Sequence, residues 1–333
     1  MSVQSVLEPL ATVRTELEEL YRDLHAHPEL SHEEHRTAGL VAQRLRADGF
    51  EVHEGVGGTG VVGVLARGEG PVVLLRADMD ALPVREATGL DHASTATAAD
   101  GEPVMHACGH DVHVTALLGA AHLLAEGSQH WSGTLVALFQ PGEEHGDGAQ
   151  RMVDDGLADL IPSPDVALGQ HVLVAPAGHV GTRSGPVLSA ADSLRVTIHG
   201  RGAHGSMPHV AVDPVVVAAT AVVALQQVVS RDVAPTEPAV LTVGSIRAGT
   251  TANIIPDTAE LLINIRTYDD DTRQVVLDGI DRVVQGICAA AGTPHPADVE
   301  RYQSYPLTDN DAGTTQRPRG LRGGLRRRGR RAA

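Results

Sequence analysis

Cys108 and His110 are two residues apart in the stretch Cys108-Gly109-His110-Asp111, so a thiol and an imidazole lie close together in the sequence. At a junction between a loop and a helix, both side chains can turn toward one metal ion. Thiolate sulfur and imidazole nitrogen are ligands that zinc and its neighbours accept. An alternative is that Asp111 caps the helix and that the cysteine is inert.

Glu143 and Glu144 form a carboxylate pair at the end of an apolar run. On an extended backbone, consecutive side chains point to opposite sides, so the two carboxylates would do different jobs. One can bind metal while the other accepts a proton from water and delivers it to a leaving nitrogen, as two-metal hydrolases require. The alternative is a solvated acidic loop beside Pro141 and Gly142.

His171 and the pair Asp78 and Asp80 also follow apolar runs. His171 alone would be a satisfied histidine near the surface, and the two aspartates alone could cap a turn ahead of Pro83. One aspartate could instead orient a ligand histidine, which carboxylates around metals commonly do. Polar clusters after successive strands meet at one edge of an α/β sheet, so we expect these residues to share a cleft.

The elements that must position these clusters alternate between strands and helices. Valine- and leucine-rich runs predict strands, the second of them buried on both faces, and helical periodicity predicts the helices. Ser31 and Glu34 are spaced as a capping box for the second helix. The expected segments are helices over 7–24, 33–48 and 111–126, and strands over 60–66, 71–77, 134–140 and 165–169.

The pattern changes near Gly185, where a second domain begins. It reads as a ferredoxin-like βαββαβ unit inserted after the first domain. Its expected elements are strand 194–199, helix 213–229, strands 239–247 and 259–267, helix 270–291 and strand 297–304. The fold class is therefore α/β, with a mixed sheet and helices on both faces, followed by the inserted unit. The expected domains are 1–184, 185–305 and a disordered Arg/Gly-rich tail at 306–333.

Composition excludes several functions. The 26 basic residues include eight after Gln316, so the rest of the 333-residue chain has 18 basic residues against 42 acidic ones. Phosphate would be repelled, which argues against nucleic-acid binding. No window approaches the roughly 20 apolar residues of a membrane span and no signal-like N-terminus occurs, so we expect a cytoplasmic protein without membrane contact. Two distant cysteines do not suggest a disulfide framework.

These motifs resemble the M20 peptidase family, and most closely its branch of N-acyl amino acid amidohydrolases, which includes hippurate hydrolases and auxin-conjugate hydrolases. The resemblance runs from about Leu17 to Leu307. The matching segments are 76–83 (RADMDALP), 106–111 (HACGHD), 140–144 (QPGEE), 169–172 (GQHV), 202–205 (GAHG), Asp213-Pro214 and 253–257 (NIIPD).

The resemblance implies a mixed-sheet metallohydrolase with an inserted lid and dimerisation domain. Cys108 would bridge two divalent ions, Mn or Zn and alternatively Ni or Co, with His110, Glu144 and His171 as further ligands. Glu143 would be the general base and then the general acid, acting on a metal-bound hydroxide that attacks the amide carbonyl.

The resemblance extends to catalytic and substrate residues outside the ligand set. Asp80 would support catalysis by orienting a ligand. His204 would stabilise the oxyanion in the partner subunit's active site, which implies a homodimer through the inserted domain. Asn253 would contact a small N-acyl amino acid substrate. Arg266 could meet the substrate carboxylate, although a structural salt bridge is equally consistent with its position.

Two positions depart from the family pattern. Gly142 stands where alanine is common, which leaves the chemistry unchanged. After residue 311 the chain runs into its Arg-rich end, whereas the family returns to the catalytic domain with a last histidine ligand. This departure predicts a weakened second metal site and puts activity in doubt. The tail looks like a frameshift, with an RNA- or anion-binding tail as the alternative.

Three functions therefore remain open. The leading one is metal-dependent hydrolysis of N-acyl amino acids of the hippurate type. The second is an impaired or inactive homologue that dimerises and binds metal weakly. The third is an aminopeptidase or dipeptidase of the same superfamily, although Cys108 stands where those branches resemble a ligand set with aspartate as the bridge. Neither the acyl group nor the amino acid follows from the sequence.

Overall fold

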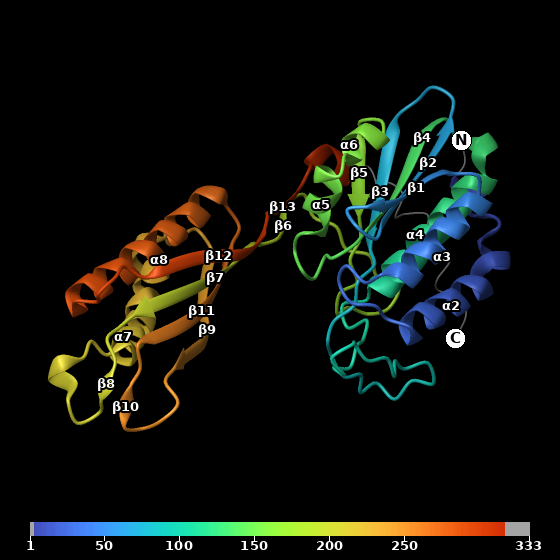
Figure 1. Cartoon of the computed structure of the whole chain (residues 1–333). Helices are drawn as coiled ribbons and strands as arrows, with labels where there is room; N and C mark the ends of the chain where they lie inside the picture. The colour runs from blue at the N-terminus through green and yellow to red at the C-terminus, as the bar shows by residue number, and fades with distance from the viewer. Residues whose placement is uncertain (1–2, 317–333) are drawn as a thin grey trace. The chain divides into compact units, whose positions relative to one another are not determined.

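The computed structural model of the chain describes residues 3–316. These residues form two compact units, one up to His179 and one from Val180 (Figure 1). The sequence placed the domain boundary between residues 184 and 185 instead, and its assignment of domain roles stays a prediction.

The first unit is built around a five-stranded sheet with strand order β1-β2-β4-β3-β5. β2 runs antiparallel to both β1 and β4, whereas β3 runs parallel to both β4 and β5, so the sheet is mixed. In chain order the elements are α1 (Val3–Leu7), α2 (Leu10–Ala26), α3 (His35–Ala47), β1 (Glu51–Val56), β2 (Gly60–Arg67), β3 (Val72–Asp78), α4 (His110–Glu126), η1 (Ser128–His130), β4 (Gly133–Gln140), α5 (Gly148–Asp154), α6 (Leu157–Leu160) and β5 (Val166–Gly169).

Helices cover both faces of this sheet, as the sequence predicted. On one face α2, α3 and α4 pack their apolar sides against β2 and β4, with Leu24, Leu45 and Phe139 almost fully buried (Figure 1). On the other face α5 and α6 cover a smaller apolar cluster, in which Met152 packs with Val62 and Val136. The predicted α/β architecture is therefore confirmed.

Several local predictions need correction. The capping box at Ser31 is wrong, because α3 begins at His35 and Ser31 Oγ instead donates to Asp80 Oδ2 at 2.7 Å. Glu34 is fully buried and accepts hydrogen bonds from the backbone N–H groups of His32 and Gly142. β3 is only half-buried over most of its length, and the polar strand β1 was not predicted.

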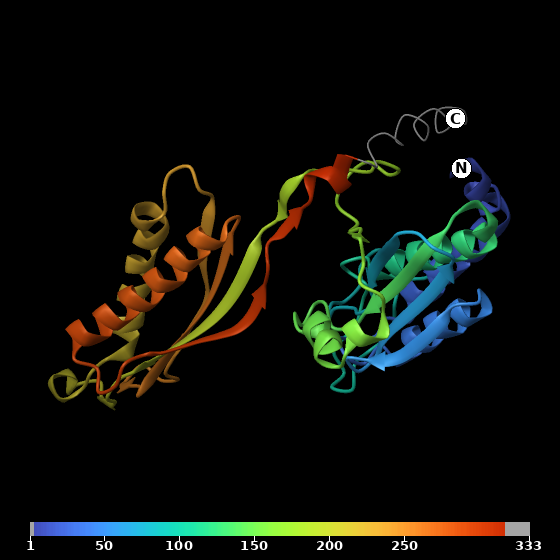
Figure 2. The same ribbon diagram turned by 90° about the horizontal axis from the view of Figure 1, so that it is seen from above.

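The second unit contains a four-stranded antiparallel sheet with order β12-β7-β11-β9, the arrangement expected of a βαββαβ unit. α7 and α8 pack on it (Figure 2). Its elements are β6 (Gly185–Leu188), β7 (Ala190–His199), β8 (Ala203–His204), η2 (Pro208–Val210), α7 (Pro214–Gln227), η3 (Val228–Asp232), β9 (Ala239–Ala248), β10 (Ile254–Ile255), β11 (Thr258–Thr267), α8 (Asp270–Ala291), β12 (Asp298–Tyr305) and β13 (Thr308–Asn310).

Local sequence explains where the two long helices begin. Asp213 accepts the backbone N–H of Val215 at 2.9 Å and is followed by Pro214, which needs no hydrogen bond at the first helical position. Asp269 likewise accepts the N–H of Thr272 at 2.8 Å, and α8 ends at Gly292 in the left-handed conformation.

Two expectations about this unit also change. Residues 308–310, assigned to a disordered tail, form β13 and pair with β6, while residues 317–333 lie outside the described part of the chain.

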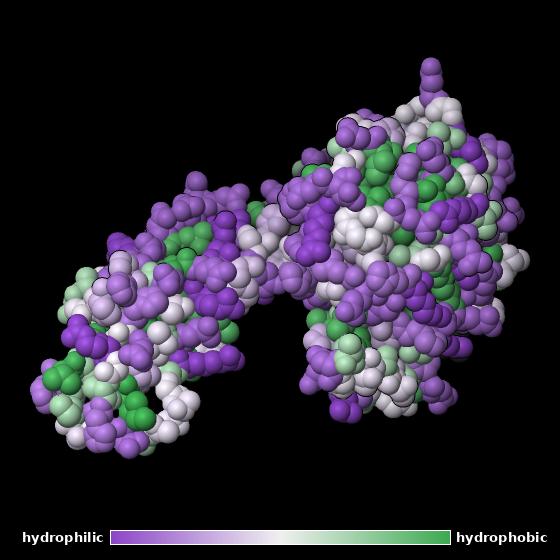
Figure 3. All heavy atoms as spheres, viewed as in Figure 1, coloured by the Kyte–Doolittle hydropathy of each residue, from purple (hydrophilic) through white to green (hydrophobic). Residues whose placement is uncertain are grey.

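The helix Pro214–Asp232 is long and apolar enough to span a membrane by length and composition alone, contrary to expectation. Its residues Val217 and Leu225 are buried in the core of the unit. On the face in Figure 3, hydrophilic residues predominate and apolar ones form separate patches.

Candidate metal centre

The candidate site lies where β3, β4 and β5 end. These three strands are mutually parallel, so the segments that follow them start from the same edge of the sheet. The N-terminus of α4 meets them there through Gly109, which has φ 80° and so suits glycine. A Cβ on Gly109 would also overlap the side chain of Val172, so glycine allows the two loops to approach.

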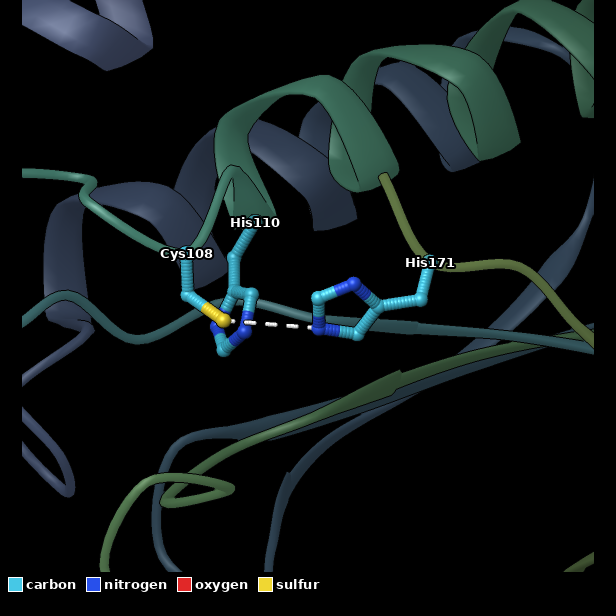
Figure 4. A group of neighbouring side chains, drawn as sticks. All are labelled: Cys108, His110 and His171. Carbon is cyan, nitrogen blue, oxygen red and sulfur yellow. Dashed lines mark hydrogen bonds between the residues drawn. The ribbon is translucent and has the colours of Figure 1, made fainter. Parts of the chain in front are cut away.

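Cys108 and His171 face one another across these loops (Figure 4). Cys108 Sγ lies 3.4 Å from His171 Nε2, and His171 Nδ1 donates to the carbonyl oxygen of Val172 at 2.7 Å. The hydrogen bond with the Cys108 sulfur raises the pKa of His171 to about 9, so in the metal-free protein Nε2 carries a proton that it donates to the thiolate. A bound ion would replace that proton on Nε2, while Nδ1 keeps its proton on the Val172 carbonyl. Hydrogen bonds from His110 and His171 lower the pKa of the Cys108 thiol. The thiolate and the imidazole are therefore oriented as two ligands of one ion.

His110 is fully buried and points its two ring nitrogens at carboxylates. Nδ1 lies 3.3 Å from Asp80 Oδ1, so Asp80 lies where it can orient the ring, as the sequence analysis proposed. Nε2 lies 3.8 Å from Glu144 Oε1 and 3.9 Å from Glu143 Oε2. Burial lowers the pKa of His110, but the attraction of the nearby Asp80, Cys108 and Asp78 groups outweighs it and raises the value to about 11.

Glu143 and Glu144 lie in a turn, so the premise of an extended backbone was wrong. Both carboxylates nevertheless approach the same imidazole, that of His110. The backbone N–H of Glu144 donates to Asp80 Oδ2 at 2.9 Å, which ties this turn to β3. Burial and the nearby negative charge of Asp78 raise the pKa of Glu143, which suits a group that must accept a proton near neutral pH.

His113 belongs to the site but was missed in the sequence. Its Nδ1 donates to Asp78 Oδ1 at 2.6 Å, and its Nε2 accepts the backbone N–H of Val172 at 2.9 Å. His113 is therefore a buried link between β3 and the loop that carries His171. Its spacing of three residues from His110 on a helix would have placed both rings on one face.

Asp111 is not the cap that the alternative reading required, because Gly109 occupies the N-cap position of α4. Asp111 Oδ2 instead accepts a hydrogen bond from His25 Nδ1 at 2.6 Å, and His25 Nε2 donates to Glu86 Oε1 at 3.1 Å. This buried network ties α2 to the first turn of α4. His25 lies 86 residues from Asp111, and no local pattern in the sequence pairs the two residues.

The side chains of the first unit fit a metal centre. The buried nitrogen Nε2 of His110 has no hydrogen-bond partner among the described residues, and three carboxylates lie 3.7–3.9 Å from it. Ligand atoms around a tetrahedral ion lie about 3.3–3.5 Å apart, so a shared cation would need only a small contraction. The combination of sulfur, nitrogen and oxygen donors suits zinc and similar divalent ions.

His204, Asn253 and Arg266 belong to the second unit and are described by themselves. His204 in β8 is exposed, and its Nδ1 accepts the backbone N–H of Ser206 at 3.2 Å. The backbone N–H of Gly205 donates to the carbonyl oxygen of Asn253 at 2.8 Å, so the structure places His204 beside Asn253. Arg266 lies on β11, where its Nε donates to Asn264 Oδ1 at 3.0 Å.

Comparisons with known proteins agree on one family. The profile of peptidase family M20/M25/M40 matches residues 74–311. The chain is 41% identical over 308 residues to an N-acetyl-L-cysteine deacetylase of Bacillus subtilis, covering 92% of this chain and 72% of that protein. It is 41% identical over 290 residues to a hippurate hydrolase of Campylobacter jejuni, covering 86% and 73% respectively.

A solved structure with the same fold also carries information about metals. The crystal structure of the YXEP protein of Bacillus subtilis, described as a dinuclear metal binding peptidase of the M20 family, matches with a TM-score of 0.76 and 31% identity. The match covers 95% of this chain and 80% of that one.

Proposed function

Because the chain belongs to peptidase family M20/M25/M40, whose relatives act on amide bonds, we propose that it hydrolyses N-acyl amino acids, with hippurate as a representative substrate. The observation that carries this proposal is the convergence of Cys108, His110 and His171 with the carboxylates of Glu143 and Glu144. A bare hydrogen-bonding network would not need two carboxylates at 3.8 and 3.9 Å from one buried nitrogen.

Cys108, His110, Glu144 and His171 would hold two divalent ions, with zinc or manganese as the preferred candidates. When bound, such ions lower the pKa of water and polarise a carbonyl oxygen. Asp80 orients His110 through Nδ1, and the carbonyl of Val172 orients His171. Both histidines therefore present their Nε2 lone pairs to the ions, which is the usual arrangement for metal-binding imidazoles.

Glu143 is the proposed general base and then the general acid. Its side chain is 29% exposed, whereas His110 is fully buried, so water and substrate can reach the carboxylate. With its pKa raised by burial and by Asp78, the carboxylate is a better proton acceptor than an ordinary glutamate. It accepts a proton from the attacking water and donates it to the leaving amine, so the two products separate as acid and amine.

Roles for the second unit follow the family resemblance. His204 would stabilise the oxyanion and Asn253 would contact the substrate, with the chain acting as a homodimer through residues 185–305. The exposure of His204 and its place beside Asn253 support this proposal. Arg266 would bind the substrate carboxylate with its guanidinium.

The test uses the full chain loaded with Zn²⁺ or Mn²⁺ and supplied with hippurate, followed by measurement of benzoate release. Glu143→Gln should reduce the rate by about 10²–10⁴-fold, the usual contribution of a general base. Glu69→Gln, which changes an exposed glutamate in the turn between β2 and β3, is the matched control and should retain full activity.

Equal rates for wild type and Glu143→Gln would refute the proposed base. A dipeptide with a free amino terminus serves as the competing substrate. If that dipeptide is cleaved and neither hippurate nor N-acetylcysteine is, the chain is an aminopeptidase or dipeptidase and the proposed substrate class is wrong.

A further inference from the structure

A second group of potential metal ligands lies on the far side of the Glu143–Glu144 turn. His32 Nε2 lies 2.7 Å from Asp147 Oδ1, and His145 Nδ1 lies 3.1 Å from the same oxygen. The three ligand atoms lie within 4.8 Å of one another. The two imidazole rings meet edge to face, with their centroids 5.4 Å apart. None of these side chains has a part in the proposed hydrolysis.

The backbone conformation and the burial of His32 are both unfavourable. Its φ is 67°, and it is the one non-glycine residue with positive φ in the described part of the chain. Such a conformation is strained for a residue with a side chain. Its Nδ1 is also buried without a hydrogen-bond partner among the described residues, which adds a desolvation cost. One hydrogen bond from Nε2 to Asp147 does not offset both.

The surroundings nevertheless hold the imidazole in this place. The backbone N–H of His32 donates to Glu34 Oε1 at 2.9 Å, and the same oxygen accepts the N–H of Gly142 at 2.8 Å. A Cβ at position 142 would overlap the ring of His32, so only glycine leaves room for it. The packing therefore fixes one ligand nitrogen next to the turn, at the expense of backbone strain.

The donor atoms are arranged for one ion. Arg151 Nε and Nη2 donate to Asp147 Oδ2 at 2.8 and 2.7 Å, which leaves Oδ1 as the single oxygen facing both histidines. Ligand atoms around a tetrahedral zinc ion lie about 3.3–3.5 Å apart, so the observed distances of 2.7 and 3.1 Å to Asp147 Oδ1 would widen by roughly 0.2–0.8 Å on binding. The His145 side chain is 63% exposed, so the remaining coordination position would be open to water.

We infer that His32, His145 and Asp147 form a peripheral site for one divalent ion of the zinc class, separate from the proposed catalytic centre. Two imidazoles and one carboxylate favour zinc, cobalt or nickel over magnesium and calcium, which prefer all-oxygen sites. The bound ion links the segment before α3 to the turn that carries Glu143 and Glu144. The binding does not depend on the proposed amide hydrolysis.

The test counts ions on the full chain by equilibrium dialysis against Zn²⁺, compared for wild type, His145→Ala and His32→Gly. The His32→Gly variant removes a ligand but relieves the positive φ, so it should fold at least as well as wild type. The control is His27→Ala, since His27 also pairs with an aspartate, Asp23, but lies on an exposed helix turn without a third ligand. We expect both site variants to bind one Zn²⁺ fewer per chain than wild type and His27→Ala.

Cobalt distinguishes the two sites, because only an ion at Cys108 gives a thiolate-to-cobalt charge-transfer band. That band should have the same intensity at saturation in wild type and His145→Ala, while the total Co²⁺ count differs by one. Equal Zn²⁺ counts in wild type and both site variants would overturn the inference, as would equally tight binding of Mg²⁺ at this site. If the wild-type chain does not hydrolyse hippurate, that result contradicts the proposed function and leaves this inference standing.

Discussion

Replacing His113 by phenylalanine should weaken metal binding without removing any proposed ligand. The phenyl ring fills the space of the imidazole but forms no hydrogen bond with Asp78 or with the backbone N–H of Val172. The loop that carries His171 then loses its link to β3. Loss of a residue that orients a metal ligand typically costs 10–100-fold in affinity, and we expect a change of about this size for Zn²⁺.

The stability change follows from the same two hydrogen bonds. A bond to a charged group contributes about 1.5–3 kcal/mol and a neutral one about 0.5–1.5 kcal/mol, so the sum is roughly 2–4.5 kcal/mol. Asp78 remains paired with Arg76 Nη1 at 2.6 Å, which keeps the cost from rising further. Denaturant unfolding with a chelator present measures this change in the free energy of unfolding without the contribution of bound metal. Competition with a chromophoric chelator measures the affinity.

His122→Phe is the matched control because it removes another histidine–aspartate pair from the same helix. His122 Nδ1 donates to Asp48 Oδ1 at 2.8 Å, but the His122 side chain is 31% exposed and lies away from the site. Its loss should cost less than about 1 kcal/mol, as for surface pairs, and leave metal affinity unchanged. If His113→Phe binds Zn²⁺ within twofold of wild type while losing stability, His113 is only structural and the positioning argument fails.

Three further predictions concern titration. Burial and the charge of Asp78 raise the pKa of Glu143, so in the metal-free protein its carboxyl should titrate above the ordinary glutamate value of 4.5 when followed by NMR, with Glu143→Gln to assign the signal; a value at or below 4.5 would contradict this. The lowered pKa of Cys108 predicts that iodoacetamide alkylates the metal-free protein faster than a model thiol at neutral pH, and that Zn²⁺ suppresses the reaction. Hydrogen bonds to Asp111 and Glu86 outweigh burial and raise the pKa of His25 above 6.5. The stabilisation that charged His25 gives to the folded state is therefore complete below pH 6.5 and is lost as the pH rises through the raised pKa. The destabilisation caused by His25→Gln, measured by urea unfolding, should therefore shrink between pH 6 and pH 9, and a constant difference would refute the charged pair.

The order and type of the elements could be predicted because their periodicity is local. α4, β4 and α8 each carry a long apolar pattern that only one kind of element satisfies. β1 was missed because Glu51–Val56 is half polar and lies at the sheet edge, where burial imposes little pattern. The capping box was wrong although Ser31 had the right spacing, because its hydroxyl donates to Asp80, which lies far away in the sequence.

The proposed ligands and the residues that orient them also differ in how far the sequence could predict them. Glu143, Glu144 and His171 could be expected to lie together because polar residues after parallel strands meet at one sheet edge. The ligand set of Cys108, His110, Glu144 and His171 came from the family resemblance. Which groups orient them depends on contacts between segments far apart in the chain, such as Asp80 with His110 or His113 with Val172. Spacing fixes neither distance nor tautomer, so the sequence could propose donor residues but not their geometry.

Residue 172 shows how much of that geometry resides in the backbone. Its carbonyl oxygen accepts a hydrogen bond from His171, and its N–H donates to His113. Its side chain packs against Gly109 and has no polar contact. The bond to His113 ties this segment to α4, and the bond from His171 Nδ1 sets the orientation of that ring. Because no side chain at position 172 takes part, inspection of residue types could not find this function. The proposed ligand His171 depends on it nonetheless.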